Sequence, residues 1–234
     1  MMAVAEVILE AERTSPLSNF DRQQFERNVN ALRVNENSWP AVLLNLLIGD
    51  ERGPDEIDES VFDGISFLIF NYDRCVEQLL FHFLRWRHGL PERLVLEIIR
   101  AIPMLHIYGV LGDAFDGPVP FGASSVELAS VAKQLQTYHE EITDRHRQGW
   151  VSAMMARAEK VCFLGFGFHP TNFERLFPGN ELHAKQLWGT AMHCEGSPSF
   201  QLAKASEGSQ FANCNPTAFI RDHGEALLNG EWFD

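Results

Sequence analysis

Ile65-Ser-Phe-Leu-Ile-Phe70 is a short apolar run that breaks off into the polar stretch Asn71-Tyr72-Asp73-Arg74. The run Lys160-Val-Cys-Phe-Leu164 repeats the pattern, because Gly165-Phe166-Gly167-Phe168-His169 follows it. Apolar runs of this length suit strands that are buried on both faces, as in a parallel sheet. In open α/β sheets, ligands bind at the carboxyl ends of such strands. The two stretches therefore predict an α/β fold with a small-molecule pocket, and we expect a nucleotide as its ligand.

Helical patterns alternate with strand patterns along the rest of the chain, which predicts a doubly wound, largely parallel sheet flanked by helices. Further strands are expected at 104–110 and 186–194. Residues 92–102 suit a helix or a strand. Helices are expected at 21–34, from Pro40 onward, and at 74–87, 124–135, 144–159 and 216–228, with a loop at 50–63. We expect one domain overall, with a mainly helical part at 1–64 and an α/β core at 65–234.

The composition limits the partners and the compartment. The chain has 234 residues and a net charge of −13, which argues against a nucleic-acid partner and against an anionic membrane surface. No apolar stretch is long enough to span a membrane. The four cysteines form no C-x-x-C pair, so a reducing cytoplasm is the expected location. His139 and His146 lie a heptad apart without further ligands nearby, so we expect exposed helix residues and no metal.

Asn71 and Asp73 are the first candidate binding residues. An Asn side chain offers a donor and an acceptor, which suits ribose hydroxyls. Asp73 can cap the helix that follows it. The alternative is that both residues serve only as turn and cap residues.

The stretch from His106 to Gly112 is the second candidate. His106 and Tyr108 lie two residues apart, so on a strand their side chains share one face. Gly109 would permit a close approach of the backbone to a ligand. The alternative for His106 is a hydrogen-bonded structural residue.

Gly165 and Gly167 form the third candidate, since two glycines directly after a strand can bring backbone N–H groups toward a phosphate. The full G-x-G-x-x-G motif is absent, because Pro170 and Thr171 follow. The alternative is a tight turn with an aromatic lid.

Together, three segments resemble the sirtuin-like NAD-binding domain, especially the branch found in bacterial anti-phage proteins that deplete NAD. Asn71-Tyr72-Asp73 is similar to the family's strand-ending N-Y-D. His106-Ile-Tyr108-Gly109-Val-Leu-Gly112 resembles its H-x-H-G-s-x-G segment. Gly165-Phe166-Gly167-Phe168-His169, with Asn172, resembles its later G-[FY]-G/S-[FL]-x-D/N segment. The resemblance covers roughly residues 65–194, about half of the chain.

The resemblance implies a Rossmann-like sheet that binds NAD as substrate or ligand, without a metal, and chemistry that breaks the nicotinamide–ribose bond. In this chain, Asn71 would orient the ribose or the attacking water, and His106 or Tyr108 would accept a proton. Asp73, Gly109, Gly165, Phe166, Gly167 and Asn172 would line the nucleotide site.

The chain departs from the family at two places. Tyr108 stands where the family has its His, and a phenol with a pKa near 10 is a poor base at neutral pH. No G-A-G-x-S phosphate loop is found in residues 1–64, so we expect a fragment, a truncated homologue or a divergent member. The zinc-ribbon cysteines are also absent, which argues against protein deacetylation.

Two readings of the function follow. The first is NAD or ADP-ribose recognition, with NAD hydrolysis if the site is complete. The second is a non-catalytic nucleotide-binding or protein-interaction module that has lost the phosphate loop. A sheet edge could also pair with a protein partner or with a second copy of the chain.

Overall fold

The computed structural model describes residues 1–18, 38–49, 52–124, 127–136, 145–182 and 185–229. By its contacts the chain forms two compact units, Met1–Ile142 and Thr143–Asp234, and each is described by itself. The helix expected at 21–34 and the side chain of His139 lie outside the described residues.

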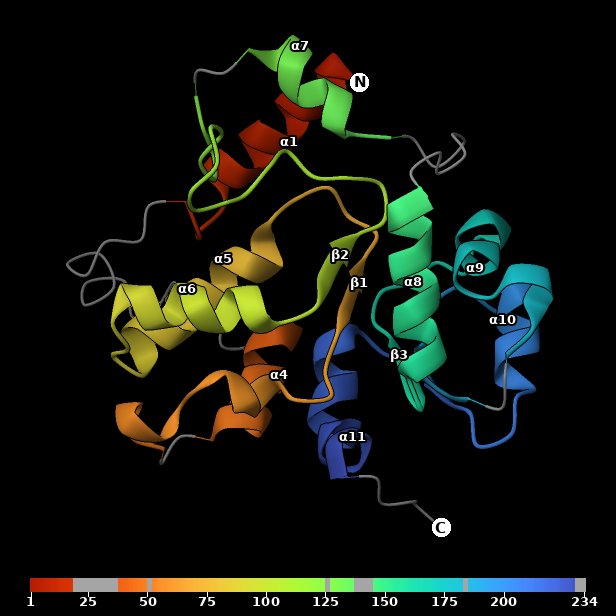
Figure 1. Ribbon diagram of the computed structural model, residues 1–234. Helices are drawn as coiled ribbons and strands as arrows, with labels where there is room; N and C mark the ends of the chain where they lie inside the picture. Colours follow the sequence, from red (N-terminus) through yellow and green to blue (C-terminus); the bar gives the residue numbers. More distant parts are fainter. Residues whose placement is uncertain (19–37, 50–51, 125–126, 137–144, 183–184, 230–234) are drawn as a thin grey trace. The chain divides into compact units, whose positions relative to one another are not determined.

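The first unit is built on two parallel strands, β1 (Phe67–Ile69) and β2 (Met104–His106), with Leu68 opposite Leu105 (Figure 1). Its helices are α1 (Met2–Thr14), α4 (Trp39–Ile48), α5 (Cys75–His82), α6 (Glu92–Ala101) and α7 (Leu128–Val131). A π-helical turn, Phe83–Arg87, extends α5, and 3₁₀ turns are formed by Pro54–Glu56, Glu59–Phe62 and Ala132–Gln134.

Two apolar clusters hold this unit together. The larger cluster joins α4, α5 and α6, with Leu44, Leu80 and Ile98 almost fully buried. The smaller cluster packs the inner face of α1 against Leu111, Val119 and α7. Helices α1 and α4, which precede residue 64, therefore share apolar cores with elements that follow residue 64.

Several expectations for the first unit are confirmed, and two are corrected. In place of the helix expected at 124–135, the described residues form the single turn α7 and the 3₁₀ turn Ala132–Gln134. The strand at 65–70, the helix at 74–87 and the helix from Pro40 are present, and 92–102 is a helix. The strand expected at 104–110 ends at His106, because its only described partner, β1, ends at Ile69. Tyr108 therefore lies in the turn after β2, and His106 and Tyr108 do not share a strand face.

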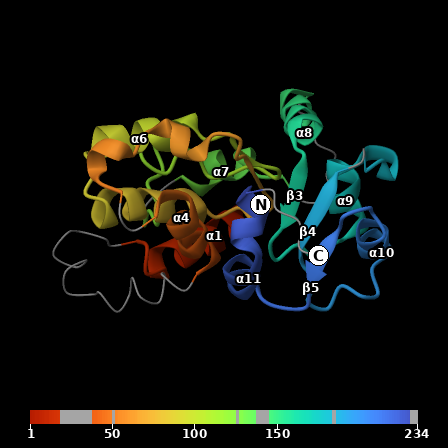
Figure 2. The same cartoon turned by 90° about the horizontal axis from the view of Figure 1, so that it is seen from below.

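The second unit contains a three-stranded parallel sheet in the order β3 (Lys160–Phe163), β4 (Gln186–Thr190), β5 (Gln210–Ala212), as Figure 2 shows. Its helices are α8 (Arg145–Arg157), α9 (Pro170–Leu176), α10 (Pro198–Lys204) and α11 (Pro216–Asn229), with a 3₁₀ turn at Pro178–Asn180. Helices α9 and α10 cover one face of this sheet, and α11 covers the other (Figures 1 and 2).

Phenylalanine rings form much of the core of the second unit. Phe168 is fully buried and its ring lies 5.0 Å from that of Phe163 and 5.2 Å from that of Phe200. The expected strand at 161–164 and the expected helix at 216–228 are present, whereas the strand expected at 186–194 ends at Thr190. Strand β5 and helix α10 were not expected. An α/β fold with parallel strands is thus confirmed at the level of fold class, and the described strands lie in two small sheets.

Candidate functional site

The polar residues after β1 start α5 and lie close to the end of β2. The Asn71 side chain is exposed, while the Oδ1 atom of Asp73 accepts a hydrogen bond from the Cys75 backbone N–H at 3.2 Å. The Tyr72 hydroxyl donates to the Gln136 carbonyl at 2.6 Å. Arg74, and not Asp73 as the sequence predicted, is the N-cap residue of α5, and no side chain caps this helix. The Asp73 carboxylate precedes the cap and is engaged by the backbone N–H of the first helical residue.

His106 is buried at the end of β2 and is bonded through both ring nitrogens. Its Nδ1 lies 2.8 Å from the Asn71 carbonyl oxygen, and its Nε2 lies 2.7 Å from the Glu77 Oε1. Both acceptors require an N–H on the ring, so the arrangement suits the protonated imidazolium. The structure thus brings His106 to the backbone of Asn71 and adds Glu77, which the sequence analysis had not singled out.

The pKa of His106 reflects these neighbours. Burial on its own would lower the pKa, but the hydrogen bond and the charge of Glu77, with the Asn71 carbonyl and Asp73, raise it above the ordinary value of 6.5. Oε2 of Glu77 is buried and has no hydrogen-bond partner among the described residues. Because both ring nitrogens face oxygen acceptors, neither nitrogen presents a lone pair to a substrate.

Tyr108 and Gly109 are enclosed by the chain itself. The Tyr108 side chain is only 3% exposed, and its ring lies 6.0 Å from that of Phe70 and 6.2 Å from that of Tyr72. Gly109 has φ +85°, and a Cβ placed there would lie 2.0 Å from the Gln134 carbonyl oxygen. The close approach for which this glycine is needed is therefore to the backbone of residue 134.

The turn after β3 is built differently. Gly165 is exposed with φ +67°, and its N–H donates to the Thr190 Oγ1 at 2.9 Å. Gly167 is also exposed, and a Cβ placed there would have no described atom within 4 Å. Phe166 is half-buried and packs 5.1 Å from the rings of Phe163 and Phe168.

Asn172 is the third residue of α9, five residues beyond Gly167. His169 begins this helix, and its Nδ1 accepts a hydrogen bond from the Thr171 N–H at 3.3 Å. The predicted site residues are therefore distributed over both units. Asn71, Asp73, His106, Tyr108 and Gly109 belong to the first, while Gly165, Phe166, Gly167 and Asn172 belong to the second.

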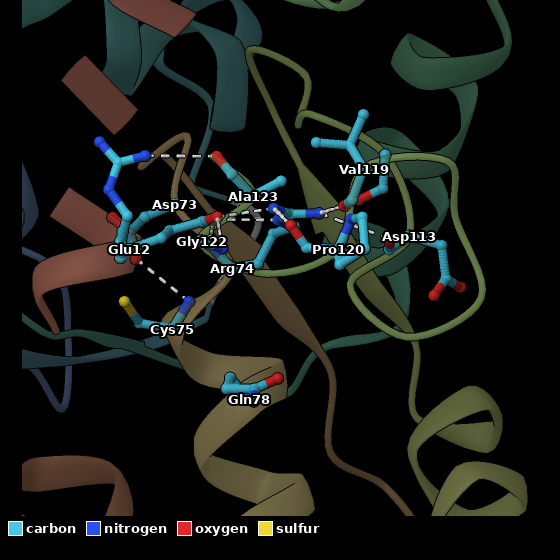
Figure 3. Close-up of polar contacts among 12 residues, drawn as sticks. Glu12, Asp73, Arg74, Cys75, Gln78, Asp113, Val119, Pro120, Gly122 and Ala123 are labelled. Carbon is cyan, nitrogen blue, oxygen red and sulfur yellow. Dashed lines mark hydrogen bonds and ion pairs between the residues drawn. The ribbon is translucent and has the colours of Figure 1, made fainter. Parts of the chain in front are cut away.

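An ion pair that the sequence analysis missed lies beside the start of α5. Glu12 of α1 is fully buried, and Arg74 is 1% exposed. The Glu12 Oε1 accepts from the Arg74 Nε at 2.9 Å and from its backbone N–H at 3.1 Å. Oε2 accepts from the guanidinium at 2.6 Å and from the Gly122 N–H at 3.1 Å (Figure 3). We call Arg74 and the Gly122 N–H, which together supply these four donors, the Arg74 cradle.

A signal for this pair was present in the sequence. Ala5, Ile8, Leu9 and Glu12 follow the i, i+3, i+4, i+7 spacing of one helix face, so Glu12 stands on an apolar stripe. A carboxylate in that position requires a buried partner. Its partner lies 62 residues away, and local spacing could not identify it.

Comparison with protein-family models, with curated proteins and with solved structures finds no match for this chain. In the described part of the chain, no three His, Cys, Asp or Glu side chains are grouped so that they could hold a metal ion. Among the same residues, no helix has the length and apolar character needed to cross a bilayer.

Proposed function

We propose that this chain is a sirtuin-like nucleotide-binding protein with a Rossmann-like, doubly wound arrangement, and that it recognises NAD or ADP-ribose without hydrolysing NAD. The observation that carries the proposal is the turn after β3. Gly165 and Gly167 are exposed there, directly after a strand of a parallel sheet. Ligands of such sheets bind at the carboxyl ends of the strands.

The chemistry of this turn suits a phosphate-containing ligand. Backbone N–H groups in a glycine turn can point at phosphate oxygens, and an absent Cβ lets the ligand approach the chain. Gly167 has open space where a side chain would stand. The Gly165 N–H is held by Thr190, so we assign the contact with the ligand mainly to the backbone around Gly167.

The surroundings of His106 and Tyr108 favour binding without turnover. A general base needs a lone pair within reach of the proton that it removes. Both nitrogens of His106 already donate to oxygen atoms, and the Tyr108 side chain is buried among aromatic rings. Under this proposal His106 is a positioning residue that fixes the Asn71 backbone.

Calorimetric titration of the full chain with NAD and with ADP-ribose tests the binding. We expect both ligands to bind, and Gly167→Ala to weaken each by about tenfold, because a Cβ would block the backbone approach. Gly196→Ala is the matched control, since Gly196 is exposed with open space around it and lies outside the turn. Failure of the unmodified chain to bind either ligand would end the proposal.

NAD hydrolysis is the second candidate, and the exposed side chain of Asn71 at the end of β1 favours it. That side chain could orient a ribose while His106 holds its backbone carbonyl. Incubation with NAD should then release nicotinamide, and Asn71→Ala should stop the release. No release by the wild-type chain, together with binding of NAD, would leave only the non-catalytic function.

A further inference from the structure

The Glu12 carboxylate has the surroundings of a bound anion. Four N–H donors converge on its two oxygens, and all four come from residues outside α1 (Figure 3). Two are backbone groups, of Arg74 and Gly122, and two belong to one guanidinium. Arginine forks and backbone N–H groups are the donors that proteins use to bind phosphate and carboxylate groups.

Groups other than Glu12 also hold the Arg74 cradle in place. The remaining guanidinium N–H groups donate to the carbonyls of Val119 at 2.5 Å and Pro120 at 3.2 Å. Longer contacts reach the carbonyls of Gly112 and Asp113 at 3.5 and 3.4 Å. The loop from residue 112 to residue 122 therefore holds the side chain of Arg74 in place, with two of its donors directed at the anion.

The occupant of the cradle comes from the last turn of a helix. Glu12 lies two residues before the end of α1, whereas Ala5, Ile8 and Leu9, earlier in the helix, make its apolar contacts. Helix ends fray more readily than helix centres. The chain that follows is anchored by the buried Leu17, and the Arg13 backbone lies against Gly122, so release of Glu12 requires a local opening of the last turn of α1.

A purely structural role explains this arrangement poorly. Buried ion pairs usually add little stability over well-packed apolar residues of similar size, because both charges lose their hydration. A site that takes an anion from solution needs the same buried donors, and it gains from a carboxylate that fills it when the ligand is absent.

We propose that the Arg74 cradle is a binding site for a phosphoryl group of a small anion, and that Glu12 occupies it as a removable internal substitute. Two oxygens of a phosphoryl group present the same pair of acceptors as the carboxylate, so the ligand exchanges with Glu12 and no donor is left unpaired. The site lies in the first unit, goes beyond the proposed recognition of NAD and does not depend on it.

Calorimetric titration of the full chain with inorganic pyrophosphate tests the site. The wild-type chain should bind weakly, because its cradle is occupied for most of the time. Glu12→Gln should bind about tenfold more tightly or better, since an amide competes poorly for a guanidinium. Glu10→Gln is the matched control, because it removes an exposed carboxylate from the same helix, and it should bind like the wild type. Glu12→Gln combined with Arg74→Met should remove this gain in affinity.

Hydrogen exchange on the wild-type chain gives a readout that needs no variant to fold. Pyrophosphate should speed the exchange of the amides of residues 12–14 as the last turn of α1 is released. A purely structural ion pair would leave these amides unchanged. Unchanged exchange at the highest soluble pyrophosphate concentration overturns the proposal, and so does a folded Glu12→Gln that binds no more tightly than the wild type. Binding of pyrophosphate without any binding of NAD would support this site and rule out the proposed function. Binding of NAD without any binding of pyrophosphate would support the proposed function and rule out this site.

Discussion

The turns after β2 and β3 each combine glycines with aromatic residues, yet the chain closes them in different ways. After β2, the backbone of the turn packs against the backbone of residues 134–136. The Gln136 N–H donates to the Tyr108 carbonyl at 2.8 Å, and Gly109 lies against the Gln134 carbonyl. After β3, side chains hold the turn. The Gly165 N–H donates to the Thr190 hydroxyl at 2.9 Å, and the Ser197 hydroxyl donates to the Phe168 carbonyl at 2.7 Å. Gly165 and Gly167 are exposed to solvent, whereas Gly109 is buried.

The largest effect that we expect from this difference is on Gly109. A Cβ at this position would lie 2.0 Å from the Gln134 carbonyl oxygen, and alanine would also be strained at φ +85°. Gly109→Ala should lower the free energy of unfolding by about 3 kcal/mol or more, because the backbone of residues 134–135 has to move. Urea denaturation followed by circular dichroism measures this loss.

Gly167→Ala is the matched control for that experiment. No described atom lies within 4 Å of its added Cβ, so the free energy of unfolding should change by about 0.5 kcal/mol or less. Equal effects of the two substitutions would show that the turns do not differ in the way described.

The sequence predicted the elements of this fold better than the role of its glycines. The strands at β1 and β3 and the helix α11 follow from apolar runs and periodicity, which are local signals. Gly109 and Gly167 look alike in the sequence, because the atoms that decide their roles belong to residues remote along the chain. Strand β5 was missed, since three residues in a tail rich in Gly, Ser and Asn carry no strand pattern.

The candidate site was predicted in part for the same reason. Asn71, Asp73 and His106 could be singled out because polar residues follow apolar runs. Glu77 could not, since it lies on α5 and reaches His106 only through the packing of that helix against β2. Glu12 and Arg74 are 62 residues apart, and their pairing depends on how α1 packs in the unit.

A smaller effect on stability is expected from the ion pair between Glu77 and His106 at the end of β2. Glu77→Gln removes the negative charge that faces the Nε2 of His106, so it should cost about 1–2 kcal/mol of unfolding free energy near pH 6. The pKa of His106 is raised in the folded chain, so its stabilising contribution is complete below the unfolded value of about 6.5. That contribution is lost as the pH rises through the folded pKa. We therefore expect the difference in unfolding free energy between the wild-type chain and Glu77→Gln to decrease from about pH 6 to pH 9, as urea denaturation can measure.

His82 provides an internal check on this pH dependence. It is buried on the same helix, and burial, opposed by its hydrogen bond to the Leu17 carbonyl, lowers its pKa to about 4. Its contribution has the opposite sign, because it is complete above about pH 6.5 and is lost as the pH falls toward 4. The wild-type chain and Glu77→Gln both lose the His82 contribution at acid pH, so it cancels in the difference between their unfolding free energies. A difference that stays constant from pH 6 to pH 9 would contradict the charged state of His106.

The smallest effect is expected where one side chain holds the turn after β3. Thr190→Val keeps the shape of this buried residue and removes the acceptor of the Gly165 N–H, at a cost of about 1 kcal/mol. Gly165 is exposed, so water can replace the lost partner, and its amide proton should exchange faster with solvent. Thr190→Ser retains the hydroxyl and should keep that amide protected, as amide exchange followed by NMR can show. If valine leaves the Gly165 amide as protected as serine does, the turn is held by its backbone after all, and the contrast with the turn after β2 disappears.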